Sequence, residues 1–225
     1  MIPCISVETM RLSDEYTIAN LVPSLTLMYR AARGVYLAHS WQGRTAIVAG
    51  SGNNGGDGFA LACILKEEGF DCAVFTLSSR LSADSAYYAA KAETLGVPVE
   101  PFVPGCLNGF STVVDCLLGT GFQGGVRDSY RSAIEQINAS DAFILSVDIN
   151  SGMNGDTGAC EICVRSDLTV TIGFVKQGLV TEAAGGCMKK LVCADIGIVL
   201  VKEEGCLAPE TCPGWLDMTV INAVV

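Results

Sequence analysis

Three segments of this sequence place carboxylate and amide side chains directly after short apolar runs. Residues 50–58 are rich in glycine and asparagine, residues 115–127 carry an aspartate, four glycines and an arginine, and residues 148–152 read Asp-Ile-Asn-Ser-Gly. A carboxylate that ends a buried strand either caps a loop or faces a cation, because an unpaired buried charge is too costly. Backbone N–H groups at the junction of a glycine-rich loop and a helix bind phosphates well. The expected chemistry is recognition of a phosphate-bearing ligand beside groups able to transfer protons.

The first segment satisfies G-x-G-x-x-G but departs from a dinucleotide fingerprint. That fingerprint needs an acidic residue about 20 positions on, at the end of the second strand, whereas Asp71 begins the corresponding run. Asn53, Asn54 and Asp57 also exceed what a pyrophosphate loop requires, which indicates a more specific polar contact. The alternative is a structural turn whose asparagines tolerate left-handed backbone.

Asn54, Asp115 and Ser151 together supply oxygen ligands without histidine or thiolate. This set suits an alkali or alkaline-earth cation rather than zinc or copper. With one full carboxylate it fits a monovalent ion such as potassium. A hydrogen-bonded cluster of the same three residues without an ion is the alternative, and both remain open on the sequence.

The elements that must position these segments follow an α/β pattern. Half of the 225 residues are hydrophobic and 17% are charged, which favours strands buried on both faces. We expect strands at 45–49, 71–77, 97–101, 112–116, 142–147, 168–172 and 190–194, and helices at 7–20, 24–38, 58–68, 82–95 and 129–140. Such alternation predicts one domain over 1–225 with a parallel sheet and helices on both faces, whose strand ends form the ligand crevice. The tail after about residue 198, with Pro209 and Pro213, reads as irregular, either loosely held or once leading into another domain.

Composition excludes several classes of function. The net charge of −10 argues against nucleic acid or an anionic membrane as partner. No apolar run approaches the ~20 residues of a membrane span, no signal peptide is evident, and eleven scattered cysteines suit a reduced, cytoplasmic protein. The one histidine, His39, excludes sites built on several histidines. Cys160 and Cys163 form one CxxC, and Cys187 is spaced wrongly to complete a zinc site, so we expect two free thiols near a turn.

Taken in order, these segments resemble the YjeF N-terminal domain family, the NAD(P)HX epimerases. Residues 50–58 resemble its G-x-G-N-N-G-G-D-G loop, residues 115–121 its D-x-x-x-G-T-G segment, and residues 147–158 its V-D-x-x-S-G-x-x-x-D-T-G segment. Further matches lie at 23–28, 165–172, 176–178 and 194–197, so the resemblance covers about residues 6–198. Two departures are Asn150, where the family usually has proline, and Arg80, where it often has lysine.

The resemblance implies a Rossmann-like three-layer α/β/α sandwich that forms a homodimer. The implied activity interconverts the R and S epimers of hydrated NADH and NADPH (NADHX and NADPHX), which carry a hydroxyl at C6 of the nicotinamide ring. The implied substrate-binding residues are Asn53, Asn54, Gly55, Gly56, Asp57, Gly119, Thr120, Gly121, Phe122, Arg127 and Asp148, and one potassium ion per subunit would be bound by Asn54, Asp115 and Ser151. Many relatives are fused to a dehydratase. Here the dehydration step would lie on another protein, or the chain is a fragment or a lone copy.

Asp148 is the candidate catalytic residue, because epimerisation at C6 requires the hydroxyl to leave as water and water to return on the other face. Its basic partner is not identified, since Arg80 cannot shuttle protons. A non-catalytic nucleotide- or protein-binding module and an NAD-dependent oxidoreductase are the alternatives. The joint presence of Asp57, Asp115, Asp148 and Ser151 favours the epimerase, and the missing ribose-binding acid weakens the oxidoreductase.

Overall fold

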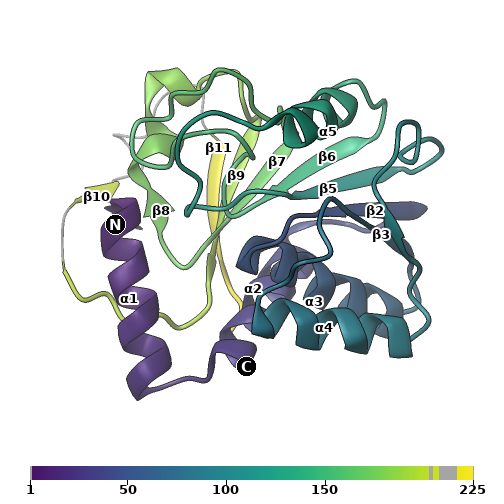
Figure 1. The fold of residues 1–225 in the computed structure, drawn as a ribbon. Helices are drawn as coiled ribbons and strands as arrows, with labels where there is room; N and C mark the ends of the chain where they lie inside the picture. The colour runs from purple at the N-terminus through teal and green to yellow at the C-terminus, as the bar shows by residue number, and fades with distance from the viewer. Residues whose placement is uncertain (1, 203–204, 208–216, 225) are drawn as a thin grey trace.

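A parallel sheet between two helical layers forms the body of the protein (Figure 1). The computed structural model describes residues 2–202, 205–207 and 217–224. Within these ranges eight strands lie in the order β11-β9-β7-β6-β5-β2-β3-β4, and every neighbouring pair is parallel. The strands are β2 (Arg44–Ala49), β3 (Asp71–Thr76), β4 (Val99–Pro101), β5 (Thr112–Cys116), β6 (Phe143–Val147), β7 (Leu168–Ile172), β9 (Lys190–Asp195) and β11 (Asp217–Asn222).

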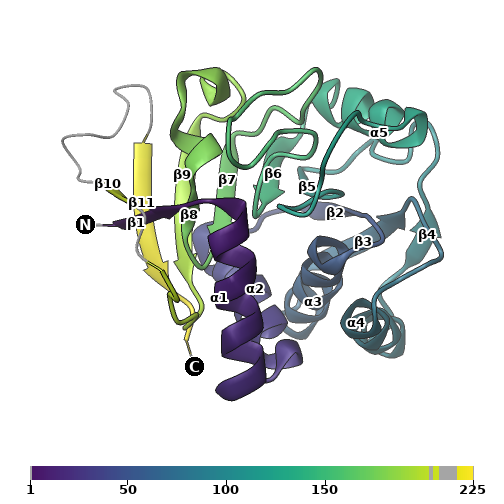
Figure 2. The same cartoon turned by 60° about the vertical axis from the view of Figure 1, so that its left-hand side comes forward.

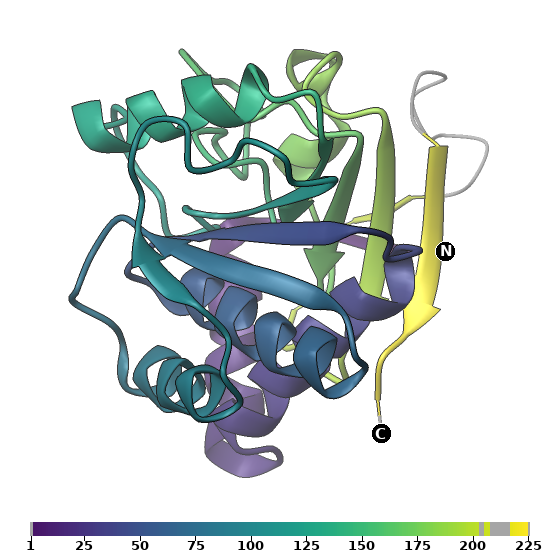
Figure 3. The same cartoon turned by 90° about the vertical axis from the view of Figure 1, so that its right-hand side faces the viewer.

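Helices cover both faces of this sheet, as the alternating pattern predicts. Helices α2, α3 and α4 pack side by side on one face, and α5 covers the other (Figure 3). The helices are α1 (Val7–Asn20), α2 (Ser24–Ala38), α3 (Asn53–Glu67), α4 (Ala83–Thr94) and α5 (Asp128–Asn138). On α5 the buried residues Ala133, Ile134 and Ile137 recur at helical spacing against the sheet. In the described part of the chain, no helix combines the length and apolar character needed to cross a membrane.

A small second sheet, absent from the sequence-based expectation, lies beside α1 (Figure 2). It consists of β1 (Ile2–Ile5), β8 (Val175–Lys176) and β10 (Cys206–Leu207), with β1 parallel to β8 and antiparallel to β10. After β8 come the short 3-10 helices η1 (Gln177–Val180) and η2 (Glu182–Ala184). Strands of two to four residues leave no clear periodic pattern in a sequence, so their pairing is decided by tertiary contacts.

The tail after residue 198 differs from its expected irregular form where the structure describes it. β11 pairs with β9 along its whole length, from Asp217 opposite Lys190 to Asn222 opposite Asp195. Its residues are mostly exposed because it lies at the sheet edge, although Val220 and Ile221 are apolar. Pro209 and Pro213 lie outside the described residues.

Helix α3 begins at Asn53, five residues before the expected start at Gly58, so most of the glycine-rich segment is the first turn of a helix. Glycine disfavours helix, but here close packing requires it. A Cβ on Gly55 would lie 2.2 Å from the Gly50 carbonyl oxygen, and one on Gly50 would lie 1.9 Å from the Leu117 carbonyl oxygen. The absence of side chains therefore lets α3 start directly against the ends of β2 and β5.

The strand order reverses beside β2. From β2 the chain moves outward to β3 and β4, and it then returns to form β5 on the other side of β2. The loops that follow β2 and β5 consequently diverge, and such a reversal is where open α/β sheets bind ligands.

Candidate functional site

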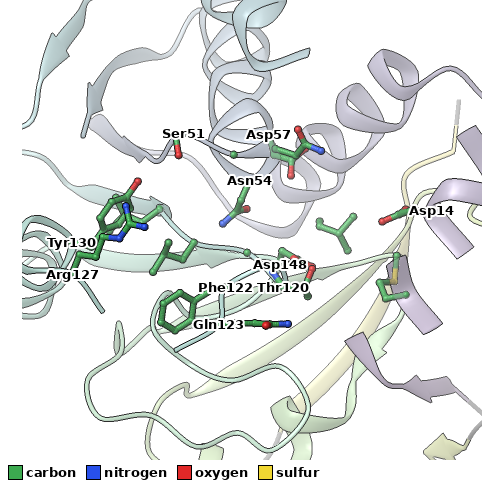
Figure 4. A pocket seen from close by; sticks show the side chains of 18 of the residues that line it. Asp14, Ser51, Asn54, Asp57, Thr120, Phe122, Gln123, Arg127, Tyr130 and Asp148 are labelled. Carbon is green, nitrogen blue, oxygen red and sulfur yellow. Dashed lines mark hydrogen bonds between the residues drawn. The ribbon is translucent and has the colours of Figure 1, made fainter. Parts of the chain in front are cut away.

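A cavity of about 610 Å³ opens at this reversal, beside the carboxyl ends of β2, β5 and β6 (Figure 4). Its volume is within the usual range for small-molecule sites. The three polar segments singled out in the sequence all contribute to its wall. The lining residues are Met10, Asp14, Ser51, Gly52, Asn53, Asn54, Asp57, Leu117, Leu118, Gly119, Thr120, Gly121, Phe122, Gln123, Gly125, Arg127, Tyr130, Asp148 and Ile172.

The first turn of α3 presents Asn53, Asn54 and Asp57 to the cavity. The Asn53 side-chain oxygen accepts a hydrogen bond of 2.8 Å from the Ser82 hydroxyl. Asn54 is 7% exposed, and neither its Oδ1 nor its Nδ2 has a hydrogen-bond partner within the described ranges. Buried amide groups are nearly always hydrogen-bonded, and leaving one unsatisfied is costly. Asn54 therefore points to a ligand that supplies the missing partners.

Asp148 is held in a strained backbone conformation at the cavity wall. Its φ is 68°, and no other non-glycine residue in the described ranges has a positive φ. The Ile149 N–H donates a 2.8 Å bond to the Val147 carbonyl, which closes a tight γ-turn around Asp148. One carboxylate oxygen accepts a 3.3 Å bond from the Thr120 N–H, and the other accepts a 2.5 Å bond from the Lys176 ammonium. Strain of this kind persists where the surroundings fix the residue, and it is common at functional sites.

Lys176 is the basic partner that sequence reasoning did not identify. Its side chain is 1% exposed, and besides Asp148 it donates to the Ile172 carbonyl at 2.7 Å and the Thr171 hydroxyl at 3.1 Å. All three ammonium protons are thus used. The signal was present as a lysine directly after the apolar pair Phe174-Val175, but only β8 brings it to Asp148. Arg80, in contrast, is exposed and does not line the cavity.

Three carboxyl groups share the same end of the cavity: Asp14, Asp57 and Asp148 (Figure 4). Burial raises the pKa of Asp57 well above its usual value, and the nearby Asp148 and Asp14 carboxylates raise it further. Burial likewise raises the pKa of Asp14 to about 6, against the opposing effect of the Lys176 ammonium. Asp14 was not predicted, because nothing distinguishes it from the other acidic residues of α1. Both shifts favour the protonated form of these carboxyl groups relative to an ordinary aspartate.

The opposite end of the cavity suits an anion. Arg127 is the N-cap residue of α5, and it lies with Tyr130 far from Asp14 (Figure 4). The N-termini of α3 and α5 both reach the cavity, and helix N-termini favour negative charge. Gly119 lets the loop between β5 and α5 lie close to Asn54 and Asp148, since a Cβ there would lie 3.2 Å from the Asn54 Cβ and 3.3 Å from an Asp148 oxygen. The cavity is therefore basic at one end and acidic at the other.

Asp115 and Ser151 contact each other directly but do not line the cavity. Asp115 is fully buried and accepts bonds of 2.5 Å from the Ser151 hydroxyl, 3.0 Å from the Ser151 N–H, 2.9 Å from the Ser146 hydroxyl and 3.2 Å from the Leu117 N–H. Burial raises the pKa of Asp115, and these four hydrogen bonds oppose that effect. The Ser151 hydroxyl also accepts a 2.9 Å bond from the Leu118 N–H, which ties the β5 loop to the β6 loop.

Gly55 and Gly56 also lie outside the cavity lining, although the resemblance implied a role in substrate binding. Both are buried inside α3. A Cβ on Gly56 would lie 2.6 Å from both the Met28 Cε and the Ser85 Oγ. Close packing around α3 therefore leaves no room for a side chain at either position.

The CxxC thiols are free, as expected, but Cys187, whose sequence spacing did not place it with the pair, lies beside them. The Cys160 and Cys163 sulfurs are 3.4 Å apart, and the Cys163 and Cys187 sulfurs are 3.3 Å apart. The three residues come from two separate loops, so their spacing in sequence carried no information about their distance in space.

Comparison with known proteins agrees with the cavity and the fold. Residues 24–178 match the family described as YjeF-related protein N-terminus. An NAD(P)H-hydrate epimerase of Limosilactobacillus fermentum is 36% identical over 199 residues, which cover 85% of this chain and 95% of that protein. The crystal structure of the yeast protein ynu0 superposes with a TM-score of 0.70 at 21% identity, over 78% of this chain and 82% of the yeast chain.

A longer relative matches over part of its length only. The bifunctional NAD(P)H-hydrate repair enzyme Nnr of Archaeoglobus fulgidus is 40% identical over 188 residues, and these cover 81% of this chain but 39% of the archaeal protein. The family match, the full-length bacterial relative and the shared architecture agree with one another. The chain belongs to the family of YjeF-related N-terminal domains.

Proposed function

We propose that this chain is an NAD(P)H-hydrate epimerase, an isomerase that interconverts the R and S epimers of NADHX and NADPHX. The observation that carries the proposal is Asp148, a strained carboxylate paired with the buried Lys176 in a cavity at the sheet reversal. A binding module would need the cavity but not this costly arrangement. The full-length bacterial relative with the epimerase name supports the same activity.

The two ends of the cavity suggest how the substrate lies. Its phosphates would contact Arg127 and the N-terminus of α5. The hydrated nicotinamide ring would then reach the acidic end, between Asp57 and Asp148. This orientation separates the anionic part of the substrate from the carboxylates.

The acidic end has the groups that epimerisation requires. Loss of the C6 hydroxyl as water leaves a positively charged, conjugated ring, which nearby carboxylates stabilise electrostatically. Asp148 would hold the proton that moves between the enzyme and the C6 oxygen, first as acid and then as base. Lys176 orients its carboxylate, and burial raises the pKa of the second carboxyl, Asp57, well above its usual value.

We propose one potassium ion per subunit, bound by Asn54, Asp115 and Ser151. The residues fit such an ion, because the buried Asn54 oxygen has no partner, and Asp115 and Ser151, which contact each other, offer a carboxylate and a hydroxyl. The ion would supply a fixed positive charge that helps to hold an anionic substrate. Asp115 and Ser151 are also hydrogen-bonded without an ion, so removal of potassium should weaken substrate binding without unfolding the protein.

The proposal extends to partners. A dehydratase on a separate chain would consume one epimer, as the two-activity name of the archaeal relative suggests. A homodimer is our further proposal, and the exposed apolar residues Leu12, Tyr16, Ile18 and Leu21 on and after α1 support a contact there. Light scattering of the purified chain measures its oligomeric state directly.

The decisive experiment supplies purified protein with one epimer of NADPHX and follows the other by chromatography, with and without potassium. We expect Asp148→Asn to abolish turnover while the circular dichroism spectrum stays unchanged. Asp71→Asn is the matched control, because Asp71 is exposed at the start of β3, at the opposite end of the strands. Normal turnover by Asp148→Asn would refute the catalytic assignment. Tight binding of NADPHX without turnover by the natural chain would refute the epimerase and favour a binding module.

A further inference from the structure

The sulfur atoms of three cysteines lie close together, near the segment that follows Asp148. Cys160 and Cys163 lie in the loop between β6 and β7, and Cys187 lies just before β9. Their sulfurs all fall within 4.8 Å of one another, with two separations of 3.4 and 3.3 Å. Three thiolates at about 2.3 Å from a tetrahedral zinc ion would lie about 3.8 Å apart. Small side-chain rotations therefore convert this cluster into three corners of a metal site.

We propose that Cys160, Cys163 and Cys187 bind a soft divalent cation, Zn²⁺, through three thiolates. Binding forms three Zn–S bonds and releases the thiol protons, without any change of oxidation state. Thiolate sulfur selects zinc over the hard cations that suit oxygen ligands. This site is separate from the cavity and from the oxygen ligands of the proposed potassium ion.

The loops around the cluster are already fixed by other contacts. The Asn150 side-chain amide donates to the carbonyls of Val164 and Cys187 at 3.0 and 2.9 Å, so it joins both cysteine-bearing loops. The Val164 N–H also donates to the Ser151 carbonyl at 3.0 Å. Because the loops are held together without a metal, the sulfurs are preorganised, and the ordering entropy that metal binding must overcome is reduced.

A route for the ion and for a fourth ligand is present. Cys160 is exposed and lines a second cavity of about 240 Å³, whereas Cys163 and Cys187 are buried behind it. Water can therefore reach the cluster from this side and complete a tetrahedral shell.

The position of the cluster gives the ion a structural effect. Asn150 lies two residues after Asp148 and one before Ser151, and its amide is bonded to the Cys187 loop. A metal that joins Cys160, Cys163 and Cys187 would restrain the segment that follows Asp148. We expect zinc to raise the melting temperature of the protein by several degrees, since a ligand that binds the folded state stabilises it.

Zinc content measures the proposal without reference to epimerase activity. The full chain is purified under a non-thiol reductant, stripped with a chelator, incubated with Zn²⁺ and analysed for bound metal after gel filtration. We expect one zinc per chain, and binding of Co²⁺ with intense sulfur-to-metal charge-transfer absorption. The variant Cys160→Ser/Cys163→Ser/Cys187→Ser should lose at least tenfold in zinc affinity and all of the cobalt absorption. Cys106→Ser, which changes a partly buried cysteine outside the cluster, should behave as the natural chain does.

Two further readouts distinguish loss of the site from loss of the fold. The triple variant should keep the circular dichroism spectrum of the natural chain, and single Cys160→Ser, at the exposed position, should weaken zinc binding without unfolding. Zinc should also protect three thiols of the natural chain from alkylation. Equal zinc content in the natural chain and the triple variant would overturn the proposal. Formation of a disulfide within the cluster in the presence of excess zinc would overturn it as well.

Discussion

Replacement of Asp14 by asparagine should stabilise the protein at neutral pH. Asp14 faces the Asp57 and Asp148 carboxylates, and burial raises its pKa from 3.8 to about 6. Between these two values the folded state binds more protons than the unfolded state, so the free energy of unfolding falls as pH rises through this window. At 1.36 kcal/mol per pKa unit, the penalty above pH 6 is at most about 3 kcal/mol. Because Asp14 is only partly buried, we expect a gain of about 1–2 kcal/mol for Asp14→Asn.

The assay is urea unfolding of both proteins at pH 7.5 and pH 4. The gain should be present at pH 7.5 and should largely vanish at pH 4, where most of the Asp14 carboxyl is protonated in the folded state. Glu93→Gln is the control for a general change of net charge, because Glu93 is exposed on α4. A gain of equal size at both pH values, or no gain at pH 7.5, would contradict the assignment of a buried, destabilising charge to Asp14.

Three further variants test other parts of the site. Lys176→Met leaves the Asp148 carboxylate without its cation, so we expect a loss of about 3 kcal/mol in unfolding free energy. We also expect kcat to fall by a larger factor than KM changes. Melting curves and kinetics measure both, and unchanged kcat would remove Lys176 from the mechanism. Arg127→Gln should raise the KM for NADPHX about tenfold at low salt and less at high salt; a KM change independent of salt would contradict phosphate contact. Asn54→Leu should abolish the dependence of activity on potassium, and a retained dependence would place the ion elsewhere.

The sequence determined the architecture and the approximate place of the site. The apolar runs of β2, β5 and β6 end in polar residues, and a parallel sheet must bring such strand ends to one edge. The cavity lined by Asn54, Thr120 and Asp148 follows from this rule. The edge strand β11 was missed because its short apolar pair, Val220-Ile221, lies in a proline-containing tail that reads as irregular.

Only the tertiary structure decided the partners within the site. Lys176 reaches Asp148 through a two-residue strand, and Asp14 reaches the same cavity from α1, although neither lies near Asp148 in the sequence. The contact of Cys187 with Cys163 likewise joins loops 24 residues apart. Local sequence encodes hydrogen-bond periodicity and turn chemistry, so it predicts elements and their ends. Distances between side chains on separate elements depend on how those elements pack, and this information is spread over the whole chain.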